Sequence, residues 1–69
     1  MAKTPVPNEN YDVVSVLYHL LQGADTIEKY CQDADTASDQ ELTSFFREVQ
    51  ENSNQMARKA QDILKKRLQ

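Results

Sequence analysis

Apolar or small residues recur in alternating steps of four and three along residues 13–34, and this spacing constrains the fold more than any other feature. These residues are Val13, Leu17, Leu20, Ala24, Ile27, Cys31 and Ala34. Such a heptad pattern predicts an amphipathic helix that packs against other helices along one seam. With Asn8 or Asn10 as its N-terminal cap, this first helix is expected over about residues 9–35.

A second seam of the same kind follows later in the chain. Its members are Leu42, Phe46, Val49, Ser53, Met56, Ala60 and Ile63. Ser38 and Glu41 have the S-x-x-E spacing of a capping box, in which each side chain bonds a free backbone N–H at a helix start. The pattern therefore predicts a turn at residues 36–38 and a second helix over about residues 39–68.

These elements give an all-α fold with a simple domain organisation. Pro5 and Pro7 disfavour helix at the start of the chain, so residues 1–7 are expected to form an extended arm. Residues 8–69 are expected to form an antiparallel helical hairpin, because a short turn forces consecutive helices to run in opposite directions.

The length of the chain points to self-association. A chain of 69 residues is shorter than the roughly 70–80 residues at which one hydrophobic core gives comfortable stability. Cys31 is the only cysteine, so no disulfide forms within one chain, and a lone thiol fits a reducing cytoplasm. Since one hairpin buries each apolar seam only on the side facing its partner helix, we expect a homodimer in which two copies form a four-helix bundle.

Charge and hydropathy exclude several classes of partner. Residues 1–41 contain two basic and eight acidic side chains, whereas residues 42–69 contain six basic and three acidic ones. This asymmetry matches the helix dipoles, because acids cluster at the predicted helix starts and bases near residue 66. We expect no nucleic-acid binding, since the total charge is negative and no aromatic platform accompanies the bases. No apolar run is long enough for a signal peptide or a membrane span, so a cytoplasmic protein is expected.

Residues with chemical potential are few and scattered. His19 lies beside the first seam, where a flanking residue is the simpler interpretation than a ligand or a general base. Cys31 lies on the seam and is expected to pack there. Tyr11, Tyr18 and Tyr30 are expected to be packing anchors with a hydrated hydroxyl, with a redox-active set as the alternative.

The two helical segments resemble a known family. The sequences YHLLQGADTIEKYCQDAD and ELTSFFREVQENSNQMARKAQDIL are similar to one helical hairpin of the ferritin-like superfamily, of the rubrerythrin type. In that family two hairpins supply a di-iron site, with a Glu from the first helix and a Glu-x-x-His pair from the second. The resemblance places these ligand positions at Leu20, Ser53 and Met56, which are poor or unsuitable ligands for iron.

The resemblance therefore implies a scaffold without the family's metal chemistry. We expect a non-catalytic bundle that acts as a structural or protein-interaction module, with no cofactor, and with itself and an unidentified protein as partners. The alternative is a metal-binding or small-ligand-binding bundle that uses Glu28, Glu48, Glu51 or His19. The polar run from Gln50 to Gln55 stays open, because Asn52 or Asn54 could be solvated or could bond across the bundle.

Overall fold

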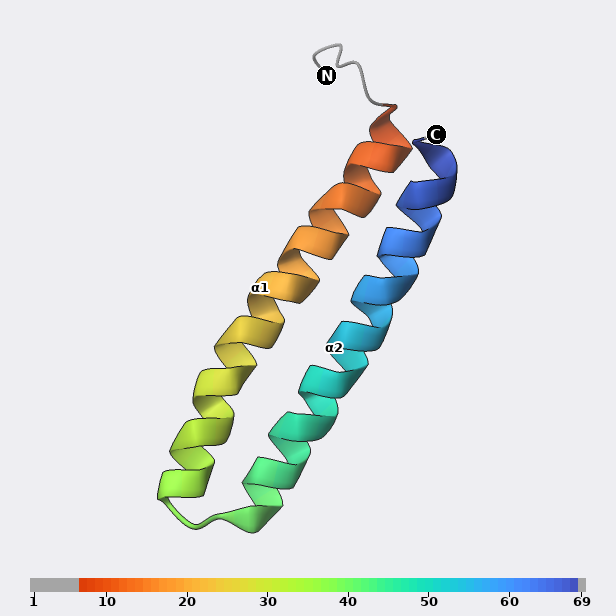
Figure 1. Ribbon diagram of the computed structural model, residues 1–69. Helices are drawn as coiled ribbons and strands as arrows, with labels where there is room; N and C mark the ends of the chain where they lie inside the picture. The colour runs from red at the N-terminus through yellow and green to blue at the C-terminus, as the bar shows by residue number, and fades with distance from the viewer. Residues whose placement is uncertain (1–6, 69) are drawn as a thin grey trace.

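The computed structural model describes residues 7–68, which form two long helices lying side by side (Figure 1). Helix α1 spans Asn8–Thr36 and helix α2 spans Gln40–Arg67. They run antiparallel, so the start of α1 and the end of α2 lie at the same end of the molecule and the turn between them lies at the other (Figure 1). Each boundary differs by one residue from the sequence-based range. Residues 1–6 of the predicted extended arm lie outside the described residues.

The start of α1 corrects the predicted cap. Pro7 occupies the cap position, and no side chain caps the helix. The Pro7 carbonyl accepts hydrogen bonds from the backbone N–H groups of Asn10 and Tyr11 at 3.1 and 3.0 Å. Asn10 lies within the first turn and is buried, and its Oδ1 atom has no hydrogen-bond partner among residues 7–68. The proline ring fixes φ at the helix entrance, and it offers no side-chain acceptor to the first turn.

The predicted capping box at the start of α2 is also wrong. Ser38 has a φ angle of 57°, in the left-handed region, and follows the last turn of α1. The N–H groups of Ser38 and Asp39 donate to the carbonyls of Asp35 and Ala34 at 3.0 and 2.9 Å. This is the Schellman arrangement that closes a helix C-terminus. Ser38 therefore ends α1, and Asp39 caps α2 by accepting a bond from the Leu42 N–H at 3.1 Å.

Small side chains form most of the contact between the helices. The buried hydrophobic residues are Ala24, Cys31, Ala34, Ala57, Ala60 and Leu64. Leu64 is the only large one of them, and Cys31 is the only fully buried side chain of the described residues. The two helices consequently pack closely without enclosing a volume of large apolar side chains.

The predicted α1 seam faces α2, whereas the predicted α2 seam lies to one side of the contact. On α1, the seam residues between Val13 and Ala34 are all buried or half-buried. On α2, the contact follows Thr43, Gln50, Ala57 and Leu64, which recur every seven residues. Of the predicted α2 seam, Ala60 is buried, Phe46, Val49 and Ser53 are half-buried, and Leu42, Met56 and Ile63 are exposed.

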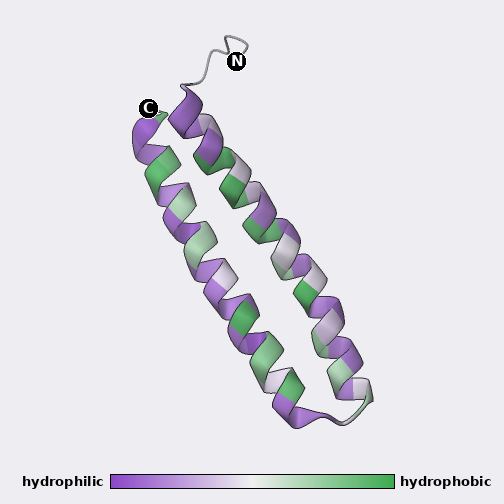
Figure 2. Ribbon diagram, turned by 180° about the vertical axis from the view of Figure 1, so that it is seen from behind, coloured by the Kyte–Doolittle hydropathy of each residue, from purple (hydrophilic) through white to green (hydrophobic). Residues whose placement is uncertain are grey.

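The resulting molecule is a single layer of two helices. Its principal extents are 50 × 23 × 12 Å, and the smallest of them is about the diameter of one helix. Hydrophobic residues recur along both helices among hydrophilic ones (Figure 2). Neither helix contains a stretch long and apolar enough to cross a membrane, within the part of the chain that the structure describes. The predicted all-α antiparallel hairpin is confirmed.

Candidate functional site

Three hollows follow one another along one side of the hairpin, which we call the open face. Its residues on α1 are Val13, Val16, Leu20, Gly23 and Tyr30, and those on α2 are Leu42, Phe46, Val49, Ser53, Met56, Ala60 and Ile63. Most members of each helix recur every three or four residues, which is about one turn, so they point in similar directions.

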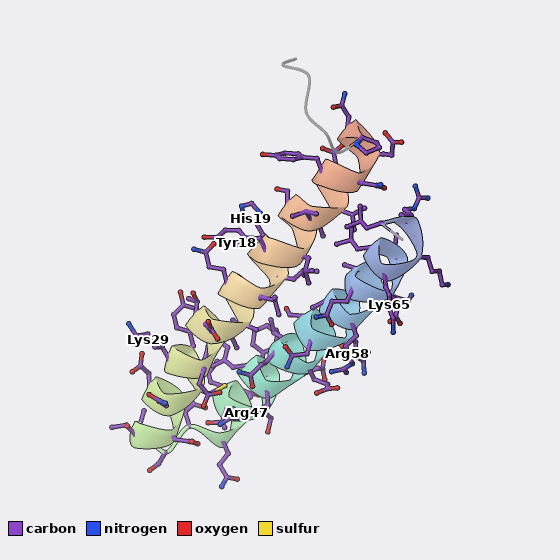
Figure 3. The ribbon with its side chains drawn as sticks, turned by 45° about the horizontal axis from the view of Figure 1, so that its top comes forward. Tyr18, His19, Lys29, Arg47, Arg58 and Lys65 are labelled. Carbon is purple, nitrogen blue, oxygen red and sulfur yellow. The ribbon has the colours of Figure 1, made fainter. Side chains whose placement is uncertain are left out.

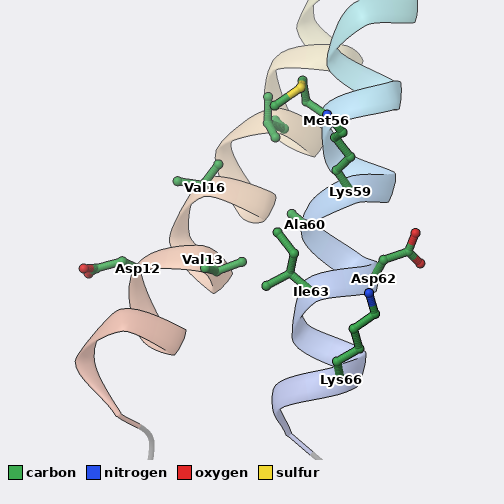
Figure 4. A pocket seen from close by; sticks show the side chains of 10 residues that line it. Asp12, Val13, Val16, Met56, Lys59, Ala60, Asp62, Ile63 and Lys66 are labelled. Atoms are coloured by element: carbon green, nitrogen blue, oxygen red, sulfur yellow. The ribbon is translucent and has the colours of Figure 1, made fainter.

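The largest hollow lies near the chain ends and has a volume of about 640 Å³. Val13 of α1 and Ile63 of α2 extend into the space between the helices, whereas Asp12 points away from α2 (Figure 4). Lys59 and Lys66 stand at its α2 rim. The hollow thus combines an apolar floor with charged side chains at its edge, which is the usual composition of an interaction surface.

The positions that the family resemblance singled out line the large and the central hollow, which adjoin at Leu20. Leu20 lines both the large hollow, which it shares with Met56, and the central hollow, which it shares with Ser53. Gly23 and His19 also line the central hollow. The structure therefore gathers Leu20, Ser53 and Met56 at one level of the open face.

The third hollow lies at the turn end. Tyr30 and Phe46 meet across it with ring centroids 5.8 Å apart, and the Phe45 ring lies tilted against Phe46 with centroids 5.7 Å apart. Leu42 and Ala34 complete the apolar part of this hollow. Aromatic rings thus contact one another at this end of the open face, although Tyr30 and Leu42 remain exposed.

Large apolar side chains on the open face remain exposed to solvent. Val16, Tyr30, Leu42, Met56 and Ile63 each keep more than two fifths of their surface accessible. Met56, for example, is 50% exposed. A contiguous exposed apolar surface on a small protein marks a site where another molecule packs.

On the opposite side of the hairpin, polar side chains of Glu28, Arg47 and Gln50 tie the two helices together. Arg47 lies nine residues before Met56, which is two and a half turns, so the two side chains point in opposite directions. Arg47 Nη1 donates to Glu28 Oε2 at 2.8 Å, and Gln50 Nε2 donates to the same oxygen at 2.9 Å. These bonds to Gln50 and Arg47 lower the pKa of the Glu28 carboxyl, and the bond to Glu28 raises the pKa of Arg47.

Gln50 explains part of the polar interruption in α2. Its Nε2 atom also lies 3.3 Å from the carbonyl oxygen of Ala24, so the side chain bridges the helices. Glu51, Asn52 and Gln55 are exposed, whereas Ser53 and Asn54 are half-buried. Within the run from Gln50 to Gln55, it is therefore Gln50 that bonds across the hairpin, and no bond of this kind involves Asn52 or Asn54 among the described residues.

The other candidate residues do not converge on one site. Tyr18 and His19 project from α1 away from α2 (Figure 3). His19 Nδ1 lies 2.7 Å from the Ser15 carbonyl oxygen and donates to it, and its ring meets Tyr18 edge-on. Cys31 is fully buried. Within residues 7–68, no group of three His, Cys, Asp or Glu side chains is placed to hold a metal ion.

Sequence reasoning missed the position of the open face relative to the helix contact. It took the most apolar line of α2 as the line that meets α1. Gln50 and Thr43 belong to the contact instead, and their only sequence signal is a seven-residue spacing that continues to Ala57 and Leu64.

Comparisons with known proteins leave the family open. No protein-family model matches the chain, and no curated protein or solved structure matches it. The ferritin-like resemblance stays a prediction.

Proposed function

We propose that the protein is a non-catalytic homodimer of the ferritin-like type, in which two hairpins form a four-helix bundle that acts as a structural or protein-interaction module. The observation that carries this proposal is the open face. Its large apolar side chains are solvent-exposed in one hairpin and become buried when two open faces meet.

The core within one hairpin is small. The contact between α1 and α2 buries mainly alanine side chains, whose burial contributes far less than that of leucine or phenylalanine at about 25 cal/mol per Å². The side chains with the largest apolar surface, including Phe45, Met56 and Ile63, point elsewhere. A second layer of helices over the open face enlarges this core.

A second copy is the simplest source of that layer. Two layers, each 12 Å thick, make a bundle of ordinary proportions. A standard interface buries roughly 800 Å² on each partner, and the open face extends along both helices from Val13 to Tyr30 and from Leu42 to Ile63. Twofold symmetry lets this one surface serve both subunits.

Another exposed apolar stripe remains outside such a bundle. Val14 and Leu21 of α1 lie nine residues before Gly23 and Tyr30, so they point away from the open face. Tyr11 and Tyr18 continue this stripe, and all four side chains are exposed. Tyrosine is enriched where proteins meet. We assign this stripe to the unidentified protein partner.

The residues at the ferritin-like ligand positions support a non-catalytic role. Leu20 and Met56 make an apolar floor, and Ser53 contributes one hydroxyl. Cys31, with no exposed surface, is closed to a substrate. His19 has one ring nitrogen engaged by its own helix.

The large hollow supports a second candidate function, the binding of a small apolar ligand. Its volume of about 640 Å³ lies within the roughly 300–1,000 Å³ of ligand pockets. Its apolar lining residues, which include Val13, Leu20 and Ile63, suit an apolar ligand, and two acids and two bases stand around them. Native mass spectrometry of the purified protein separates the candidates, because a bound small molecule of constant mass supports ligand binding and a plain dimer supports the module.

The experiment that tests the homodimer compares two substitutions with matched exposure. Met56 on the open face is 50% exposed and Leu21 on the opposite side is 46% exposed. Met56→Glu places a charge in the proposed interface and should weaken dimerisation at least about tenfold. Leu21→Glu makes the same kind of change outside it and should leave dimerisation unchanged.

Sedimentation equilibrium over a range of protein concentrations measures both effects. A wild-type protein that stays monomeric at millimolar concentration contradicts the proposal. Equal weakening by the two variants contradicts the assignment of the open face.

A further inference from the structure

Four charged residues of α2 lie along the edge of the open face that is remote from α1. Glu41 and Lys59 are 18 residues apart, and so are Glu48 and Lys66. Eighteen residues make five full turns, so the members of each pair point in the same direction. All four side chains are exposed. The acids occupy the half of α2 near the turn, and the bases occupy the half near the chain ends.

This line of charges is complementary to the same line on a second copy of α2 that runs in the opposite direction. The midpoint of Glu41 and Lys66 in the sequence lies between Ser53 and Asn54, and the midpoint of Glu48 and Lys59 lies at the same place. The neighbouring apolar residues have nearly the same centre. The midpoint of Leu42 and Ile63 in the sequence lies between Asn52 and Ser53, and so does the midpoint of Val49 and Met56. A second copy of α2 that runs in the opposite direction therefore meets apolar residues with apolar residues and acids with bases.

Helix α1 has a matching centre. Val16, Gly23 and Tyr30 recur every seven residues on the open face, and Gly23 is their midpoint. Gly23 and Ser53 line the same central hollow. The centres of symmetry of the two helices therefore lie at one level of the hairpin, as a single twofold axis requires.

We infer that two copies pair through their open faces with their turns at opposite ends, about a twofold axis that passes beside Gly23 and Ser53. The inference rests on the proposed homodimer and specifies its geometry. Each α2 lies antiparallel to the partner's α2, and each α1 lies antiparallel to the partner's α1. Glu41 faces the partner's Lys66, and Glu48 faces the partner's Lys59.

Charge also distinguishes this arrangement from the one with both turns at the same end. With the turns at opposite ends, Glu41 and Glu48 both gain basic partners. One pair is then repulsive, because Asp12 meets the partner's Asp33. With the turns at the same end, each α2 lies beside the partner's α1. Lys66 then gains the partner's Asp12 while Glu41 meets the partner's Asp33, so attraction and repulsion are equal in number. Opposite-end pairing has the larger number of attractive contacts, and complementarity of this kind fixes orientation.

The space beside Gly23 also favours close pairing of the two copies at this level of the hairpin. A Cβ atom added at Gly23 would meet no atom within 4 Å, so the packing of the hairpin itself does not require glycine there. Helix α1 runs through this position without a positive φ angle. The glycine instead leaves room for another backbone to approach, which is how small residues act where helices cross.

Cross-linking between two cysteine substitutions tests the orientation. Glu48→Cys and Lys59→Cys are prepared separately, and Cys31 is retained because it is fully buried. In the inferred dimer, position 48 of one copy and position 48 of the other are offset by about 11 residues, or about 16 Å, which exceeds disulfide reach. The same offset separates the two copies of position 59. Neither variant alone should cross-link under oxidised glutathione, whereas their mixture should give disulfide-linked dimers.

A distance measurement gives an independent reading of the same geometry. Spin labels on Gln40→Cys lie at the turn ends of the two subunits. Helix α2 has 28 residues, so opposite-end pairing should separate the labels by more than about 40 Å. A dimer with labels closer than about 30 Å and no cross-link in the mixture overturns the inference and leaves the homodimer standing. A monomer at every concentration overturns the homodimer and this inference with it.

Discussion

Ser38 and Asp39 are adjacent in the turn, yet they belong to different helices. Ser38 takes the left-handed conformation that closes α1, a position where glycine is usual because it has no Cβ. Asp39 accepts a hydrogen bond from the Leu42 N–H and lies beside the positive end of the α2 dipole. The carboxylate thus accepts a bond from an N–H group that has no partner within the helix, and its negative charge lies beside the positive end of the helix dipole.

Asp39→Ala should lower the free energy of unfolding by about 0.5–2 kcal/mol, because the first turn of α2 loses its cap. Ser38→Ala should change it by less than about 0.5 kcal/mol, since the Ser38 contribution comes from its backbone. Urea denaturation of both variants at one protein concentration measures the difference. Equal destabilisation by the two substitutions would restore Ser38 as the cap.

The sequence predicted that a cap stands in this turn but assigned it to the wrong residue. Ser38 with Glu41, and Asp39 with Leu42, both offer a polar side chain three residues before a helical N–H. The φ angle of Ser38 decides between them, and a dihedral angle is set by how the two helices meet. A local pattern does not contain that information.

At the scale of the helices, α2 carries two distinct rows of side chains. One line, through Gln50 and Ala57, contacts α1, and the other, through Val49 and Met56, belongs to the open face. The heptad on α1 predicted its contact surface because small and apolar residues coincide there. On α2 the most apolar line and the contact line differ, because Gln50 satisfies its polar atoms with Ala24 and Glu28.

The link between Glu28 and α2 predicts a pH dependence. The pKa of Glu28 is lowered from 4.5 by bonds from Gln50 and Arg47, so the charged carboxylate stabilises the folded state. This stabilisation is fully present above pH 4.5 and is lost as the pH falls through the lower pKa of the folded state. Glu28→Gln should therefore lower the Tm at pH 7, and the difference from wild type should shrink on acidification below about pH 4.5.

Glu51→Gln is the matched control. Glu51 pairs with Arg58 at 3.5 Å within α2, and both side chains are 61% exposed, so its replacement should have little effect. Thermal melts of the three proteins at equal concentration across this pH range provide the measurement. A difference for Glu28→Gln that persists unchanged at about pH 3 would contradict the role of its charge.

The whole molecule is one layer of two helices. At this scale the sequence predicted the hairpin itself but not the arrangement of two hairpins. Helix periodicity and a short turn predicted the hairpin, because both depend on local spacing. They could not give the arrangement of two hairpins, since that depends on which residues one hairpin leaves uncovered. Leu42, Met56 and Ile63 are among those residues, and their exposure follows from the packing of the two helices.

The gathering of Leu20, Ser53 and Met56 at one level allows a test of the ferritin-like scaffold. Leu20→Glu, Ser53→Glu and Met56→His combined should destabilise the metal-free dimer at neutral pH, because they bring like charges into its interior. Ferrous iron, zinc or cobalt should then raise the Tm by binding to the folded state. Thermal melts with and without metal measure both effects.

The wild-type protein is the control in this test, and its Tm should not respond to the same metals. The spectrum of the cobalt-loaded variant reports coordination directly. A variant that folds without any metal-dependent stabilisation would show that the three positions do not converge in one dimer, and it would remove the basis of the ferritin-like proposal.

The start of α1 and the end of α2 lie at the same end of the hairpin (Figure 1). Two copies joined in one gene would therefore need a linker whose length depends on how the copies face each other. With turns at opposite ends, the linker crosses the bundle, and the 28 residues of α2 set this span at about 42 Å. At about 3.5 Å per extended residue, a linker of about 12 residues is the shortest that joins them. Tandem fusions with shorter linkers should then associate between molecules into larger chains, while longer ones close into compact single-chain bundles.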